Sequence, residues 1–151
     1  MNTVEISSPG NSTFRTFLKL TKVRGIKKHG MAILSGGRQT EEVLKEFPDS
    51  CAGIVFSEDQ SPPSAAETGN IPYYRLSREL FHQLDLFGTD HPVLIVRFGI
   101  FPLFPDVEDA PGCTLCIPFQ DPANVGSVIR AAAGLGVSRV VLLKEAAHPF
   151  H

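Results

Sequence analysis

Short blocks of hydrophobic residues alternate along the chain with polar segments that are rich in Gly and Pro. Apolar runs flanked by turn residues predict strands, whereas apolar residues three or four positions apart predict helices. Strands are expected at 31–36, 51–58, 72–77 and 91–100, and helices from 14 to Gly25 or Gly30, at 38–47 and at 78–87 with Ser77 as its cap. This alternation predicts a compact α/β domain over residues 13–104.

The segments on either side of this domain have a different character. Residues 1–12 are rich in Ser, Asn, Gly and Pro and are expected to form a disordered tail. Residues 105–112 combine Pro with acidic residues and predict a linker. A strand, a helix and a strand are then expected at 113–119, 124–136 and 138–143. Such a β-α-β unit places its two strands in parallel, but it is too small to close a core of its own.

Composition narrows the class of protein. The 151 residues are 42% hydrophobic and 20% charged, which is ordinary for a globular protein. No apolar run approaches the about 20 residues that span a bilayer, and the polar N-terminus is not a secretory signal. Three Cys in such a chain indicate a reducing, cytoplasmic setting, and the lack of a long apolar run predicts no membrane partner.

The net charge of −2 conceals a basic segment near the N-terminus. Between residues 15 and 28 the chain has no acidic residue and six basic ones, namely Arg15, Lys19, Lys22, Arg24, Lys27 and Lys28. Such a cluster could neutralise the phosphates of a nucleic acid. The alternative is a solvated basic face of a helix.

Residues 120–143, which include the helix expected at 124–136, carry the most specific pattern in the chain. Asp121 and Pro122 form a turn after a strand, and Asn124 is expected to cap the helix that follows. Gly126 leaves room for a group to approach the first turn. Arg130 would then lie near the carboxyl ends of the parallel strands, where ligands of open α/β sheets bind.

The spacing of these residues resembles the first motif of the SpoU/TrmH family of SPOUT RNA methyltransferases. The matching residues are Asp121, Pro122, Asn124, Gly126, Arg130, Ala132, Gly136, Val140 and Leu142. The resemblance implies transfer of a methyl group from S-adenosylmethionine to a ribose 2′-hydroxyl of tRNA or rRNA. It makes Arg130 the catalytic arginine and Asn124 its positioning partner. Because a guanidinium is a poor base, stabilising the 2′-alkoxide or holding the adjacent phosphate suits Arg130 better.

The same resemblance predicts that residues 113–151 are only the first β-α-β of a knotted SPOUT domain. The family's cofactor motifs would lie beyond His151, so the cofactor-binding residues are unknown. The 151 residues alone are therefore expected to bind no S-adenosylmethionine and to be inactive. The intact enzyme is expected to be a homodimer.

Residues 13–104 resemble, more loosely, the family's RNA-binding domain, which has a ribosomal-protein-like α/β fold. The RNA-binding candidates are Lys22, Arg24, Lys27, Lys28 and Arg38. Two alternatives stay open, a non-catalytic RNA-binding module and an unrelated nucleotide-binding half-domain. A C-x-x-C at Cys113 and Cys116 and an H-x-x-H at His148 and His151 are too far apart for a zinc finger, so no metal site is expected.

Overall fold

The structure is a computed structural model that describes residues 3–62, 70–104 and 111–151. The chain divides into two compact units, Met1–Gly99 and Ile100–His151. The sequence predicts that the first domain ends at residue 104. In the structure, residues 100–104 are grouped with the second unit. Of the expected linker at 105–112, residues 105–110 lie outside the described residues.

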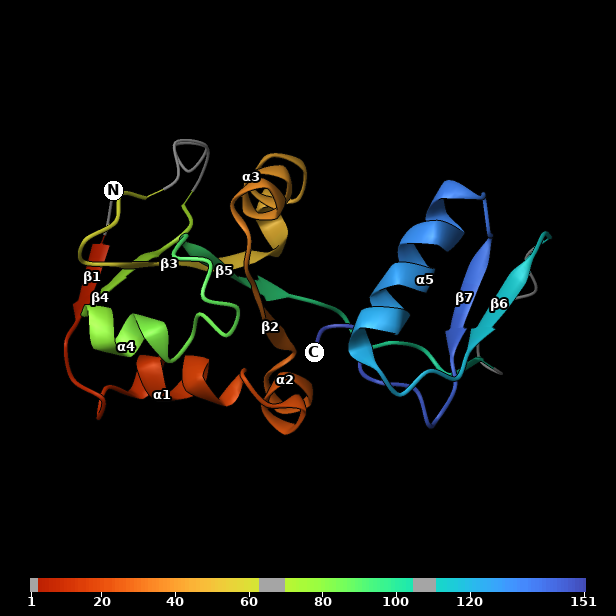
Figure 1. The fold of residues 1–151 in the computed structure, drawn as a ribbon, viewed down its shortest axis with the longest axis horizontal. Coiled ribbons are helices and arrows are strands. Elements are labelled where there is room, and N and C mark those ends of the chain that lie inside the picture. The colour runs from red at the N-terminus through yellow and green to blue at the C-terminus, as the bar shows by residue number, and fades with distance from the viewer. Residues whose placement is uncertain (1–2, 63–69, 105–110) are drawn as a thin grey trace. The chain divides into compact units, whose positions relative to one another are not determined.

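A five-stranded sheet forms the centre of the first unit (Figure 1). Its strands are β1 (Thr3–Ile6), β2 (Met31–Leu34), β3 (Cys51–Ser57), β4 (Tyr73–Leu76) and β5 (Val93–Arg97), in the order β1-β4-β3-β5-β2. β4 pairs in parallel with β1 and β3, while β5 is antiparallel to β3 and β2. The strands predicted from the sequence are therefore present, in a mixed α/β fold.

Strand β1 corrects the expectation of a disordered tail over residues 1–12. Its four residues pair in register with β4, from Thr3 opposite Tyr73 to Ile6 opposite Leu76. Ile6 is buried in the core at 2% exposure. One buried side chain and a ladder of backbone hydrogen bonds thus order a segment whose composition is that of a loop. The segment that follows is also ordered, because Asn11 caps the first helix.

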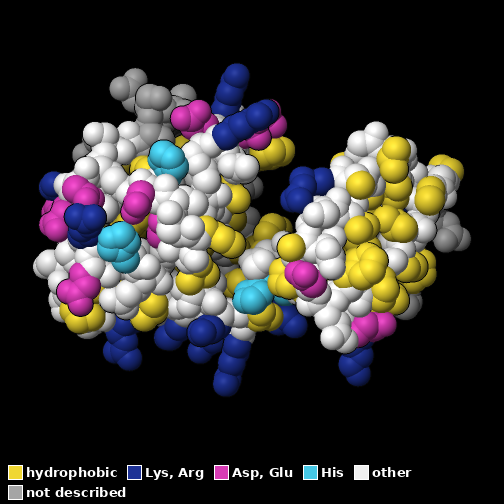
Figure 2. Space-filling view, viewed as in Figure 1, with side chains coloured by type: hydrophobic (Ala, Val, Ile, Leu, Met, Phe, Trp, Pro, Cys, Tyr) yellow, Lys and Arg dark blue, Asp and Glu magenta, His cyan; other side chains and the backbone are white. Residues whose placement is uncertain are grey.

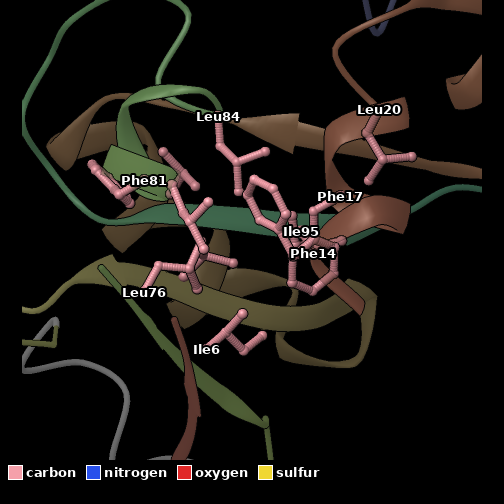
Figure 3. Packing of buried hydrophobic residues seen from close by; sticks show 11 residues of the cluster. Ile6, Phe14, Phe17, Leu20, Leu76, Phe81, Leu84 and Ile95 are labelled. Atoms are coloured by element: carbon pink, nitrogen blue, oxygen red, sulfur yellow. The ribbon is translucent and has the colours of Figure 1, made fainter. Parts of the chain in front are cut away.

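Helices cover both faces of the sheet. They are α1 (Ser12–Lys19), α2 (Val23–His29), α3 (Gly37–Glu46) and α4 (Arg78–His82), with a short 3-10 turn at Pro48–Ser50. Phe14 and Phe17 of α1 and Phe81 of α4 pack against one face, as Figure 3 shows. Leu44 of α3 packs against the other face, beside Ile54 of β3. Since Ile54 and Val55 alternate along β3, each layer has its own core.

Helix α4 is shorter than its sequence pattern predicts, and Ser77 makes no side-chain capping bond. The chain leaves the helix after His82 because Asp85, only 5% exposed, organises the turn that follows. Its carboxylate accepts hydrogen bonds from Thr89 Oγ1 at 3.1 Å and from the Asp90 amide at 2.8 Å. Hydrophobic periodicity does not record these local side-chain bonds.

The second unit contains the predicted β-α-β arrangement: β6 (Thr114–Ile117), α5 (Pro122–Gly134) and β7 (Arg139–Leu142). The two strands are parallel, with Thr114 opposite Arg139 and Ile117 opposite Leu142. Ile117, Val125 and Ala132 are buried between the helix and the strands. Across the described parts of both units, no helix is long and apolar enough to cross a membrane.

Candidate functional site

The carboxyl ends of β6 and β7 form one edge of the second unit, and α5 begins there. Because the strands are parallel, the segments that follow them lie side by side. Leu143 N–H donates to the Ile117 carbonyl at 3.0 Å, and Ala147 N–H donates to the Phe119 carbonyl at 2.8 Å. The first turn of α5 is thereby fixed at the edge where ligands of open α/β sheets bind.

Asp121, and not Asn124, caps α5. The Asp121 carboxylate accepts a hydrogen bond from the Ala123 amide at 2.8 Å, and Pro122 follows as the first helical residue. Asn124 is therefore inside the first turn, so its expected role as the cap is wrong. Its side chain is exposed and makes no hydrogen bond within the described residues. The Asn124 amide is thus accessible to a ligand.

Arg130 lies further along α5, but its side chain turns back towards the start of the helix. Its Nη2 atom donates to Ser127 Oγ at 3.2 Å. Its Nη1 atom would be 3.4 Å from a methyl group placed on Gly126, so the guanidinium lies directly over this glycine. The missing side chain of Gly126, which was expected to leave room for an approaching group, thus leaves room for the guanidinium of Arg130.

The electrostatics of this edge favour an anionic or hydroxylic ligand. Arg130 is exposed, and no carboxylate of residues 3–62, 70–104 or 111–151 forms an ion pair with it. A guanidinium has five N–H donors, of which one is directed to Ser127. The remaining donors could bind a phosphate or an alkoxide in a charge-assisted manner.

The basic segment covers α1, α2 and the turn between them. Its apolar residues face the core, including Phe14, Phe17 and Ile26. The basic members are all exposed, and they are Arg15, Lys19, Lys22, Arg24, Lys27 and Lys28. Figure 2 shows Lys and Arg side chains projecting from the lower edge of this unit, where Figure 1 places α1 and α2. We call these six residues the basic surface.

Gly25 brings the two helices of the basic surface together. It is buried within α2, where a methyl group would collide with the Lys19 carbonyl at the end of α1. The helix predicted from residue 14 onwards is thus two helices, and the second ends at Gly30 in the left-handed conformation, with a φ of 60°. Gly25 therefore serves packing and does not end a helix.

Arg38 is separated from the other RNA-binding candidates. It lies on α3, which packs on the opposite face of the sheet from α1. Its Nε atom donates to Glu42 Oε1 at 2.9 Å, which partly neutralises its charge. Arg38 therefore lies outside the basic surface, which contains the other four candidates, Lys22, Arg24, Lys27 and Lys28.

The Cys and His pairs do not come together. In the parts of the chain that the structure describes, no three His, Cys, Asp or Glu side chains are grouped as a metal site requires. Cys113 and Cys116 are exposed free thiols. His148 is packed instead against Phe101 and Phe150, with ring centroids 6.2 and 6.1 Å away.

Two curated relatives resemble the chain over almost its whole length. The "Ribosomal RNA small subunit methyltransferase G 2" of Syntrophobacter fumaroxidans is 42% identical over 97% of this chain and 30% of its own length. The "23S rRNA (guanosine(2553)-2′-O)-methyltransferase RlmP" of Bacillus subtilis is 29% identical over 97% of this chain and 57% of its own. The chain therefore spans about a third to somewhat over half of these relatives.

Solved structures of methyltransferases have the same fold as this chain over part of their length. An rRNA methyltransferase of Sinorhizobium meliloti superposes with a TM-score of 0.74 at 18% identity, over 99% of this chain and 58% of its own. The SpoU methyltransferase AviRb of Streptomyces viridochromogenes, solved with AdoMet, gives 0.70 at 21% identity, over 93% and 56%. No family model matches the chain. The chain is a relative of the SpoU/TrmH rRNA methyltransferases and corresponds to part of their length.

Proposed function

We propose that the chain is the part of an S-adenosylmethionine-dependent 2′-O-ribose methyltransferase that binds ribosomal RNA and supplies its first catalytic residues. The observation that carries the proposal is Arg130, an exposed guanidinium that is folded back onto Ser127 and over Gly126 and forms no ion pair with a carboxylate of the described residues. Both relatives are rRNA methyltransferases by name, which supports ribosomal RNA as the substrate, and the name of one of them specifies a ribose 2′-oxygen.

In this proposal Arg130 acts on the negative charge that develops at the attacking ribose oxygen. The guanidinium either stabilises the 2′-alkoxide or holds the neighbouring phosphate in a bidentate contact. Asn124 lies about two turns before Arg130 on α5 and offers a neutral amide that can orient the ribose or the arginine. The basic surface binds the RNA backbone, and Arg38 adds a separate contact.

S-adenosylmethionine would supply the methyl group. The side chains described at this edge do not fit the cofactor, because Arg130 is a cation and the sulfonium is also positively charged. Asp121, a carboxylate that could attract the sulfonium, already binds the Ala123 amide. We therefore assign no cofactor contact to residues of this chain and expect the family's later motifs to provide the pocket. The proposed homodimer would likewise form through those later parts.

A titration of the 151-residue chain with S-adenosylmethionine tests the fragment part of the proposal. Calorimetry should detect no binding in the micromolar range, because the cofactor pocket is proposed to lie outside these residues. A micromolar dissociation constant would contradict this expectation. It would also mean that residues of the second unit contact the cofactor directly.

The catalytic role is tested in a longer protein, in which this chain is combined with the part of a relative that it does not cover. Arg130→Ala should abolish methyl transfer to ribosomal RNA and leave RNA affinity nearly unchanged. Arg78→Ala is a matched control, since it removes an exposed helical arginine of the first unit that has no part in the proposal. Normal turnover with weakened binding in Arg130→Ala would instead favour a non-catalytic RNA-binding module.

A further inference from the structure

Ser127 connects the backbone of α5 to Arg130. Its hydroxyl donates to the Ala123 carbonyl at 2.8 Å, one turn earlier in the helix. The same oxygen accepts the bond from Arg130 Nη2 at 3.2 Å. Because Ala123, Ser127 and Arg130 are spaced four and three residues apart, they lie along one face of the helix. The bond to the carbonyl fixes the serine rotamer and directs its lone pairs towards the arginine.

Gly126 completes this arrangement from the neighbouring position. The guanidinium lies over it, at ordinary contact distance from where a methyl group would be. An exposed arginine otherwise samples many rotamers, and fixing them costs side-chain entropy. Ser127 and Gly126 together offer one preferred placement, over the start of the helix. We infer that Ser127 is a positioning residue that holds the Arg130 guanidinium ready for its anionic or hydroxylic partner.

This inference rests on the proposed function of Arg130, but its test does not require activity. Nuclear magnetic resonance of the 151-residue chain gives the rotamer populations of Arg130 from side-chain three-bond couplings. One net hydrogen bond changes a population ratio by about five-fold, so Ser127→Ala should reduce the folded-back population by about that factor. Ser127→Thr keeps the hydroxyl and should restore it.

The control is Thr16, whose hydroxyl makes the same kind of bond, to the Ser12 carbonyl at 3.0 Å on α1. Thr16→Ala removes such a bond without an arginine nearby and should leave the Arg130 couplings unchanged. A purely structural serine predicts no change in the Arg130 couplings in any variant. Unchanged populations in Ser127→Ala would overturn the inference and leave the proposed function intact.

The two proposals fail in different assays. Full methyl transfer by Arg130→Ala in the longer protein would overturn the proposed function. Ser127 would then have no catalytic arginine to position. If Arg130→Ala is inactive, Ser127→Ala should lower kcat by up to about five-fold with KM unchanged. A reduced kcat that Ser127→Thr does not restore would count against the positioning role.

Discussion

The backbone of Gly25 in α2 lies directly against the carbonyl of Lys19 at the end of α1. This contact lets two short helices approach closely, so that their basic side chains share one surface. Neither helix is long enough to be stable in isolation, and their packing on the core therefore maintains the basic surface. The relationship leads to the first prediction.

Gly25→Ala should destabilise the first unit by about 1–3 kcal/mol, the usual cost of forcing a group into a packed interface. Urea denaturation followed by circular dichroism would measure the change. Gly134→Ala is the matched control, because a methyl group there meets nothing within 4 Å and Gly134 also lies in a helix. The control should be neutral or stabilising by up to about 1 kcal/mol. Equal stability of wild type and Gly25→Ala would contradict the packing role.

Neutralising Lys22, Arg24, Lys27 and Lys28 together, each to Gln, should weaken binding to ribosomal RNA fragments and flatten its salt dependence. Each phosphate contact that is lost reduces the slope of log K against log salt by about 0.7–0.9. Fluorescence anisotropy at several salt concentrations measures both effects. Arg38→Gln should have a smaller effect, since Glu42 already partly neutralises Arg38. An unchanged slope in the quadruple variant would argue against the basic surface.

Substitution of Asp121 should lower the stability of the second unit, whereas substitution of Asn124 should not. Asp121→Ala removes the cap of α5 and should cost the second unit about 1 kcal/mol of stability. Asn124→Ala should leave stability nearly unchanged, because its side chain makes no bond in the described structure. Amide hydrogen exchange in α5 would measure the difference. The opposite order of effects would restore Asn124 as the cap.

The three thiols should react in a strict order. Cys51 is 5% exposed, and burial raises its pKa above the ordinary value of 9.0, whereas Cys113 and Cys116 are exposed. At pH 8 a disulfide reagent should modify two thiols quickly and the third only when the first unit unfolds. Because the folded state disfavours the Cys51 thiolate, stability should decline as pH rises above the unfolded thiol's pKa. Cys51→Ala should remove that part of the decline.

The order of helices and strands was predictable from local pattern. Buried strands such as β3 and β5 are almost continuous apolar runs, and α3 is a run of mostly helix-favouring residues that ends before Pro48. Their existence depends mainly on neighbouring residues. The parallel pairing of β6 and β7 also followed from the length of the connecting helix.

Elements that depend on particular hydrogen bonds or on distant partners were not predictable. Strand β1 forms because Ile6 enters the core and its backbone pairs with β4, some 70 residues away. Helix α4 stops early because Asp85 binds the turn at Thr89 and Asp90. Hydropathy records neither interaction: the first joins strands that are distant in sequence, and the second is a local set of side-chain hydrogen bonds within residues 85–90.

The sequence by itself determined the likeness to RNA methyltransferases, because the spacing of Asn124, Gly126 and Arg130 carries it. Only the tertiary structure decided which of the side chains in this segment are exposed and which groups they bind. It gave the cap to Asp121, left Asn124 accessible, and turned Arg130 back onto Ser127. It also separated Arg38 from the basic surface by a sheet. Spacing fixes which residues can share a helix face, whereas rotamers and layers depend on contacts that exist only in the folded chain.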